Sequence, residues 1–154
     1  MAVYLYNFGK FVEWPATAAM DDSFPICVLG RDPFGPVLDT TVAGETLGNR
    51  KLVARRIASS KEAAGCRIVF ISSSEALRVK EVLTSLEKSG ALTVSDVPGF
   101  TNGGGMIQFV LKDNKVRFEV NLSAAQKAGL IFSSQLLKVA SDIKKEPDKG
   151  GANR

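Results

Sequence analysis

Short runs of apolar residues without polar alternation are the first pattern in this chain. They lie at residues 25–30 (PICVLG) and 67–72 (RIVFIS). Because each run is too short for a helix and ends in Gly or Ser, it is typical of a strand covered on both faces of a parallel sheet. The segments at 50–58 (RKLVARRIA) and 91–96 (ALTVSD) predict two further strands. The more charged of these two, at 50–58, suits the edge of the sheet.

Helical patterns separate these strands. Aromatic residues recur on one helical face of residues 3–14, and such a stripe is more often part of the core than a binding surface. A short helix is plausible within residues 33–44. After the second apolar run, Ser72 and Glu75 form a capping box, which predicts a helix with Leu77 among its apolar positions. The alternation of strands and helices favours an α/β domain with a mostly parallel sheet.

The second half of the chain begins with a different pattern, because apolar and polar residues alternate over residues 105–122. This alternation predicts an antiparallel hairpin with one solvated face. Asp113 and Asn114 can form its two-residue turn, since both tolerate positive φ. Ser123 and Gln126 then make a second capping box, which predicts that a short helix begins there.

The chain is expected to end in a helix and a polar tail. The helix should begin near Ser133 or Ser134 and include Ile143 among its apolar positions. Residues 1–145 are expected to form one domain, because 154 residues suffice for a single hydrophobic core and no internal repeat is present. Residues 146–154 are polar and contain Gly and Pro, so we expect a disordered tail.

The composition excludes several classes of chemistry. The chain contains no histidine, which removes the commonest general base, the Ser-His and Cys-His nucleophile pairs and most catalytic zinc sites. The net charge is only +4 and the basic residues are scattered, so no nucleic-acid partner is expected. No run approaches the roughly 20 apolar residues of a membrane span, and no signal peptide is visible. We expect neither a metal nor a cofactor.

Glycines cluster between the fourth predicted strand and the hairpin, in GFTNGGGMIQF at 99–109. A P-loop is excluded, because Gly105 and Met106 stand where Lys and Ser or Thr are needed and a strand follows in place of a helix. Two interpretations stay open. The glycines serve backbone geometry, or the loop binds a ligand or partner, because ligands settle beyond the carboxyl ends of strands in open α/β sheets. The loop that would present an aromatic face and polar groups there consists of Gly99, Phe100, Thr101, Asn102, Gly103, Gly104 and Gly105.

The two cysteines, Cys27 and Cys66, lie in the first apolar run and at the start of the second. If the strand order is flavodoxin-like (2-1-3-4), their strands are neighbours and a disulfide can form. The alternative is two separate buried thiols, since free cysteine behaves as a small hydrophobe. Asp96 is the carboxylate best placed for catalysis, at the end of the fourth strand, although such a residue is usually a turn cap.

The chain resembles the YfiR-like family in segments that occur in the expected order, from about residue 4 to residue 140. They are FGKFVEWP, ICVLGRDPFG, GCRIVFIS and LTVSDVPGFTNGGGMIQFVLKDNKVRFEVNLSAAQKAGLIFSSQLLKVA. The resemblance implies a bacterial periplasmic protein with a Rossmann-like fold, made with a signal peptide that this chain would have lost or had removed. With the patterns above, the expected fold is an α/β, Rossmann-like three-layer sandwich with strand order 2-1-3-4 and an added antiparallel C-terminal hairpin.

The resemblance also implies a function. The best-known member represses a membrane-bound diguanylate cyclase through its periplasmic region, which lowers cyclic-di-GMP and biofilm formation. An outer-membrane lipoprotein can sequester that member, which tends to dimerise. We therefore expect a non-enzymatic, homodimeric regulator that binds the extracytoplasmic domain of a membrane cyclase or kinase. A periplasmic small-molecule sensor with the 99–105 loop as its rim, and an enzyme that uses Asp96, are the rival hypotheses.

For the cysteines, the resemblance implies that Cys27 and Cys66 are paired. A second cysteine pair of the best-known member, nearer its C-terminus, has no counterpart in this chain, which contains only two cysteines. Any redox control that depends on that second pair is therefore not expected here.

Overall fold

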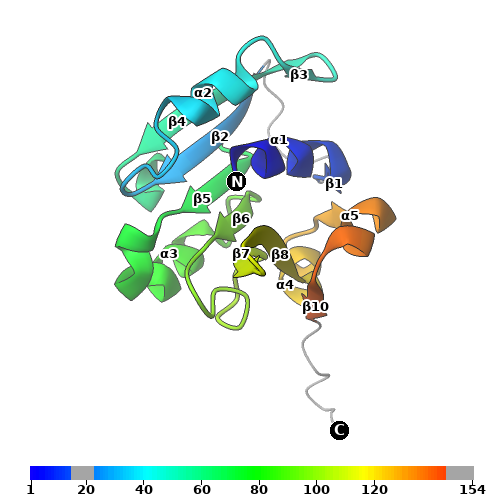
Figure 1. The fold of residues 1–154 in the computed structure, drawn as a ribbon. Coiled ribbons are helices and arrows are strands. Elements are labelled where there is room, and N and C mark those ends of the chain that lie inside the picture. Colours follow the sequence, from blue (N-terminus) through cyan, green and yellow to red (C-terminus); the bar gives the residue numbers. More distant parts are fainter. Residues whose placement is uncertain (15–22, 145–154) are drawn as a thin grey trace, which may run out of the picture.

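The computed structural model describes residues 1–14 and 23–144, so the expected tail at 146–154 lies outside the described residues. Figure 1 shows a central sheet with helices on both faces. The described elements, in chain order, are α1 (Ala2–Phe11), β1 (Val12–Glu13), β2 (Ser23–Leu29), α2 (Pro36–Val42), β3 (Thr46–Leu47), β4 (Arg50–Ile57), the 3-10 helix η1 (Ser60–Glu62), β5 (Ile68–Ile71), the 3-10 helix η2 (Ser73–Arg78), α3 (Val79–Leu86), β6 (Leu92–Ser95), β7 (Ile107–Lys112), β8 (Lys115–Asn121), α4 (Leu122–Lys127), β9 (Ile131–Phe132), α5 (Ser134–Val139) and β10 (Asp142–Lys144).

Four parallel strands form the middle of the sheet, in the order β4-β2-β5-β6. This is the flavodoxin-like order 2-1-3-4, so the predicted topology is confirmed. Every residue of β5 is buried, and all of β2 except Ser23 is buried as well. Burial on both faces explains why these two strands consist of uninterrupted apolar residues.

The predicted hairpin is also confirmed. β7 and β8 pair antiparallel, and the turn residues Asp113 and Asn114 have φ angles of 52° and 62°. Positive φ at both central positions matches the twist of the two strands, which is why the turn contains Asp and Asn. β7 pairs with β6 in parallel, and this pairing attaches the hairpin to the parallel sheet.

Two short strands extend the sheet at its ends. β3 pairs antiparallel with β4, so the charged strand at 50–57 is the second strand from that end. At the other end β10 pairs in parallel with β8. The prediction that the last helix includes Ile143 is wrong. Helix α5 ends at Val139, and Ser141 then donates both its N–H (2.8 Å) and its hydroxyl (2.9 Å) to the Phe118 carbonyl, which draws the chain onto the sheet.

The sheet separates two apolar clusters, because successive side chains of a strand point to opposite faces. The larger cluster joins Ile26 and Val28 of β2 to residues of α1, α2, α4 and α5. The smaller one joins Cys27 and Leu29 of the same strand to α3. Helix, sheet and helix thus form the three layers that were predicted.

Helix α1 packs over the hairpin through aromatic side chains. Phe8 is buried, and its ring lies 5.9 Å from the ring of Phe109 and 5.1 Å from that of Phe118. The Tyr4 hydroxyl donates to the Val116 carbonyl at 3.1 Å. The aromatic stripe is therefore core, as predicted. The helix is shorter than expected, because residues 12–13 leave it to form β1, which pairs with β9.

Two helix starts differ from the capping boxes in the sequence. Asn121, and not Ser123, caps α4, because its side-chain oxygen accepts the N–H of Ala124 at 3.0 Å. Ser72 does cap, through its hydroxyl and the N–H of Ser74 (3.3 Å), but it opens the 3-10 helix η2, which continues into α3.

Candidate functional site

The carboxyl ends of β2 and β5, where a ligand is expected in an open α/β sheet, are closed by the protein itself. The Arg31 N–H donates to the Ser74 hydroxyl at 2.9 Å. Gly30 has a φ of +92°, and a Cβ at this position would come within 3.0 Å of the side chains of Ser74 and Glu75. The two connections therefore touch directly, which leaves little space for a ligand between these strands.

Arg56 fixes the connection between β2 and α2 at the same edge of the sheet. Arg56 of β4 donates to Asp32 (3.0 Å), to Asp39 (2.9 Å) and to the carbonyl of Gly35 (2.8 Å). The hydrogen bond from Arg56 and its positive charge hold the pKa of the Asp39 carboxyl below its ordinary value. All three acceptors lie before or within α2, so this network holds the connection from β2 to α2 in place.

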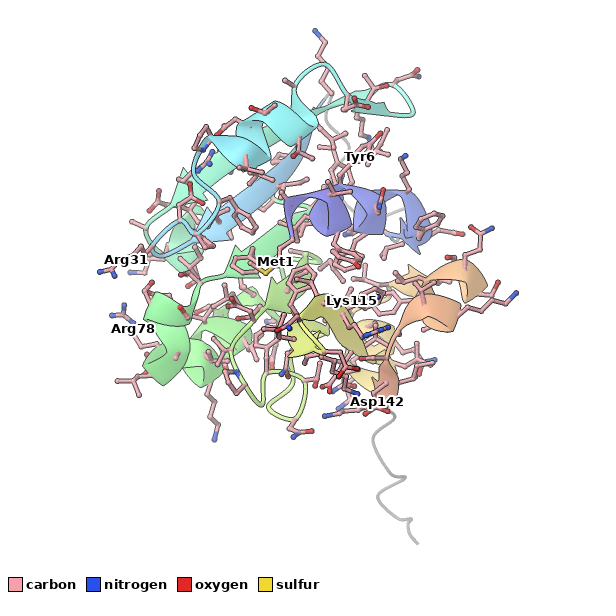
Figure 2. All side chains as sticks on the ribbon, viewed as in Figure 1. Met1, Tyr6, Arg31, Arg78, Lys115 and Asp142 are labelled. Carbon is pink, nitrogen blue, oxygen red and sulfur yellow. A yellow bond between two sulfur atoms is a disulfide. The ribbon has the colours of Figure 1, made fainter. Side chains whose placement is uncertain are left out.

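Leu77 is the most exposed of the large apolar residues in the described part of the chain, with a relative accessibility of 103%. The sequence placed it on the apolar side of a helix, and this prediction is wrong. Residues 73–78 form a 3-10 helix, whose three residues per turn direct Leu77 away from the face that α3 buries. Arg78 follows it and pairs with Glu75 at 2.9 Å. Arg31, whose N–H donates to Ser74, and Arg78, whose side chain pairs with Glu75, both lie at this edge (Figure 2).

The glycine loop does not present its aromatic residue to solvent. Phe100 and Thr101 are both buried, and Phe100 belongs to the cluster that contains the two cysteines. A Cβ added at Gly105 would lie within 3.0 Å of three carbons of the Phe100 ring. Gly99 and Gly104 have φ angles of +80° and +109°, which favour glycine. These three glycines therefore serve backbone geometry and packing.

Side chains of the hairpin hold the loop in place. The Thr101 N–H and hydroxyl both donate to the side-chain oxygen of Gln108, at 3.1 and 3.3 Å. The Asn121 amide donates to the Thr101 carbonyl at 2.8 Å. Lys144 of β10 donates to the side-chain oxygen of Asn102 at 2.8 Å. The loop is thus fastened across the outer strands of the sheet.

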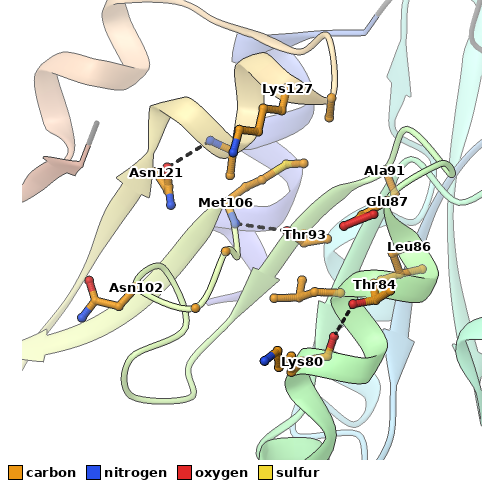
Figure 3. Close-up of a pocket in the computed structure, with 15 residues that line it drawn as sticks. Lys80, Thr84, Leu86, Glu87, Ala91, Thr93, Asn102, Met106, Asn121 and Lys127 are labelled. Atoms are coloured by element: carbon orange, nitrogen blue, oxygen red, sulfur yellow. Dashed lines mark hydrogen bonds between the residues drawn. The ribbon is translucent and has the colours of Figure 1, made fainter. Parts of the chain in front are cut away.

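The exposed tip of the loop, Asn102–Gly104, lines a cavity of about 680 Å³ (Figure 3). The other walls are α3 and α4, and buried Thr93 and Met106 lie at its base. Met106 precedes β7, and the cavity also includes Ala91, which precedes β6. The cavity therefore opens at the amino ends of these parallel strands, opposite the edge where the sequence placed a ligand.

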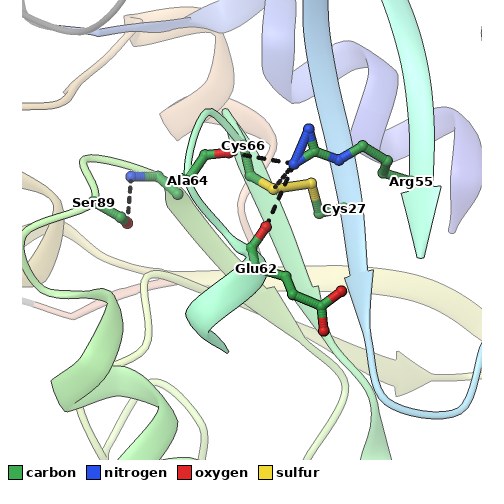
Figure 4. Close-up of a disulfide and its surroundings, with 7 residues drawn as sticks. Cys27, Arg55, Glu62, Ala64, Cys66 and Ser89 are labelled. Carbon is green, nitrogen blue, oxygen red and sulfur yellow. Dashed lines mark hydrogen bonds between the residues drawn. A yellow bond between two sulfur atoms is a disulfide. The ribbon is translucent and has the colours of Figure 1, made fainter. Parts of the chain in front are cut away.

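The two cysteines form a disulfide, as the family resemblance implied (Figure 4). Their Cα atoms are 6.0 Å apart and both residues are buried. Cys27 lies within β2, and Cys66 precedes the neighbouring strand β5. Arg55 lies over the bridge: its guanidinium donates to the Ala64 carbonyl at 3.2 Å and lies 3.6 Å from the Cys66 sulfur.

Asp96 follows β6, as predicted. One of its carboxylate oxygens is buried and has no hydrogen-bond partner among the described residues. In residues 1–14 and 23–144, no group of three His, Cys, Asp or Glu side chains is placed to hold a metal ion. Within the same residues, no helix combines the length and apolar character needed to cross a membrane.

These features define a class of protein: an α/β domain with a doubly covered, mostly parallel sheet, an internal disulfide and a cavity beside an irregular crossover loop. The chain belongs to the YfiR/HmsC-like family, whose model matches residues 1–141. No curated protein matches the sequence.

Solved structures share the fold at low sequence identity. A conserved domain protein from Vibrio cholerae superposes with a TM-score of 0.66 at 11% identity, over 93% of this chain and 60% of that one. The ABC domain of a Streptococcus pneumonia protein, solved in complex with L-Trp, gives a TM-score of 0.57 at 13% identity over 78% of this chain. The match covers 55% of that second chain, so this chain spans about 55 to 60% of the length of both structures.

The disulfide generates the first prediction. Replacement of both Cys27 and Cys66 by Ala should lower the free energy of unfolding by about 2–4 kcal/mol, because a closed loop of this length restricts the unfolded chain. The bridge spans 39 positions of the sequence. Urea unfolding of the two proteins measures the difference, and mass spectrometry without reductant should find the two cysteines in one linked peptide. Recovery of two free thiols from protein made in an oxidising compartment would contradict the pairing.

A second prediction concerns the loop. Gly105→Ala should destabilise the protein by about 1–3 kcal/mol, because the new methyl group would overlap the Phe100 ring in a packed core. Gly103→Ala is the matched control, since its nearest neighbour atom would be 3.6 Å away and its φ is not positive. Thermal unfolding of both variants separates the cost of the overlap with the Phe100 ring from the effect of an added methyl group alone. Equal stability would mean that the Phe100 ring does not need Gly105.

Proposed function

We propose that this protein is a non-enzymatic periplasmic regulator that binds the extracytoplasmic domain of a membrane signalling protein. The observation that carries the proposal is the family match over residues 1–141, nearly the whole described chain. The partner that this family favours is a diguanylate cyclase, so binding would change cyclic-di-GMP levels and biofilm formation. A homodimer and an outer-membrane lipoprotein as second partner belong to the same proposal.

The disulfide supports the proposed compartment. Structural disulfides persist in oxidising compartments such as the bacterial periplasm and are rare in the cytosol, where thiols are kept reduced. Cys27 and Cys66 lie in the core with relative accessibilities of 0% and 3%, so the bridge is part of the folded interior.

The surface around Leu77 is the contact that we propose for the partner. Leu77 is fully exposed and Arg78 follows it in η2, while Arg31 is tied to the same 3-10 helix through the Ser74 hydroxyl. Arginine is enriched among interface hot spots, and burial of an exposed apolar side chain such as Leu77 stabilises a complex. An acidic surface with an apolar depression on the partner would complement these three residues. The net charge of +4 also favours an acidic partner.

The test uses the full chain and the purified periplasmic domain of a membrane diguanylate cyclase from the same bacterium. Leu77→Ser should weaken binding about tenfold or more, as expected when a central apolar contact is truncated. Leu111→Ser is the matched control, since Leu111 is also exposed, at 70%, but lies at the end of β7.

Surface plasmon resonance gives both affinities, and circular dichroism checks that the variants fold. Wild-type affinity of the Leu77→Ser variant would exclude this contact. Failure of the wild type to bind the cyclase domain would argue against the proposed regulatory function.

The cavity favours a second candidate function, a sensor module for a small ligand. Its volume of about 680 Å³ lies within the range of ligand pockets. The Streptococcus pneumonia domain with a related fold was solved with a small molecule, L-Trp, bound to it. On this hypothesis the tip of the 99–105 loop forms the rim of the site, as the sequence proposed, although Phe100 supports the loop from below.

A thermal-shift screen of periplasmic metabolites tests this candidate. A ligand should raise the melting temperature, and Gly103→Leu should abolish the shift, because it adds a bulky side chain to a residue that lines the cavity and whose φ lies outside the left-handed region. The unliganded melting temperature of the variant should stay close to that of the wild type. If no compound in a broad library shifts the wild type, the sensor hypothesis fails.

A further inference from the structure

The wall that α3 contributes to the cavity has an unusual arrangement of charge. The helix lines the cavity with Lys80, Leu83, Thr84 and Glu87, among others. These positions are spaced i, i+3, i+4 and i+7, so they form one stripe along the helix. The stripe has a cation at one end, an anion at the other and an apolar side chain between them.

This order of charges opposes the helix dipole. Lys80 lies in the first turn of α3 and Glu87 is its C-cap, whereas a helix is stabilised by acids at its start and bases at its end. The neighbouring charges outside this cavity, Glu81 in the first turn and Lys88 just after the C-cap, follow the favourable order. Among the described residues neither Lys80 nor Glu87 has an ion-pair partner. Both side chains are exposed at the border of the cavity, and neither stands where it would stabilise the helix.

The opposite wall is kept open by a glycine that the fold does not require. Gly103 has a φ outside the left-handed region, and a Cβ there would find its nearest neighbour at 3.6 Å. Alanine would fit at this position in the empty protein. Glycine leaves room for a ligand to approach the backbone closely. On the third wall, Ala124 of α4 and its C-cap Ala128 contribute small side chains that also leave room for a ligand.

We infer that this cavity binds a short peptide of small residues with both termini free. The peptide carboxylate would pair with Lys80 and the terminal ammonium with Glu87. Seven helical residues separate these two positions by about 10 Å along the axis. An extended tripeptide spans about the same distance, since each residue adds about 3.3–3.6 Å. A single amino acid is too short to reach both charges.

The rest of the lining fits the same ligand. Leu83 and Met106 offer apolar contact to small side chains, and the side-chain amide of Asn102 keeps its N–H groups available because its oxygen accepts from Lys144. Lys127 of α4 is the other charged residue of the lining. The inference rests on the sensor function and names the class of its ligand; it is independent of the partner contact at Leu77.

Isothermal titration calorimetry with trialanine is the direct test, with N-acetyl-trialanine and trialanine amide as the blocked forms. Each blocked form should bind about tenfold more weakly than trialanine, because it loses one charge-assisted contact. Lys80→Gln should remove the preference for the free carboxylate and keep the preference for the free amine. Glu87→Gln should do the reverse. Lys88→Gln, just after α3, and Glu81→Gln, within it, are matched controls outside the cavity and should change neither preference.

Several outcomes would overturn the inference: no heat with trialanine, equal affinity for the blocked forms, or alanine binding as tightly as the tripeptide. Gly103→Leu provides a check that does not depend on charge, since it should abolish trialanine binding while the variant keeps its circular dichroism spectrum and melting temperature. If trialanine fails but the metabolite screen finds another ligand, the peptide class is wrong and the sensor function stands.

Discussion

The burial of β2 and β5 on both faces is the constraint on which the rest of the structure depends. Strands that are apolar on both sides need a covering layer above and below, and the helices and the crossover loop supply these layers. The Cys27–Cys66 bridge lies in one of the two resulting cores, where it joins the same pair of neighbouring strands. The neighbouring parallel strands β4 and β6 extend this central pair on either side.

The parallel pairing of β6 with β7 explains the glycine loop. A chain that leaves the carboxyl end of one strand must return to the amino end of a parallel neighbour, and this return usually takes a helix. Here residues 96–106 make the return without a regular helix. Phe100 fills the place of the missing helix in the core, and Gly105 makes room for its ring. The tip of the loop consequently reaches the amino edge, where it borders the cavity.

The proposed functions use opposite edges of one rigid sheet. At the carboxyl edge the connections after β2 and β5 touch directly, as between Arg31 and Ser74, and Leu77 is exposed. The amino edge holds the cavity beside α3 and α4. A regulator that binds a protein at one edge and a ligand at the other has two separate surfaces, and a variant that affects one need not disturb the other. The low identity to the solved structures limits that comparison to the fold.

Local patterns in the sequence determined the strands and the hairpin turn at Asp113 and Asn114, because side-chain periodicity and turn preferences act over a few neighbouring residues. The strand order was an assumption drawn from similar folds, which the tertiary structure confirmed. The family resemblance, and not the spacing, implied the disulfide. Only the tertiary structure decided that Phe100 is buried, that Leu77 is exposed on a 3-10 helix, that Asn121 caps α4 and that Ile143 joins the sheet. Each of these outcomes depends on contacts with residues distant in the chain or on a small change of helical pitch. The cavity likewise exists only because α3, α4 and the loop tip, which are far apart in the sequence, meet at one edge of the sheet.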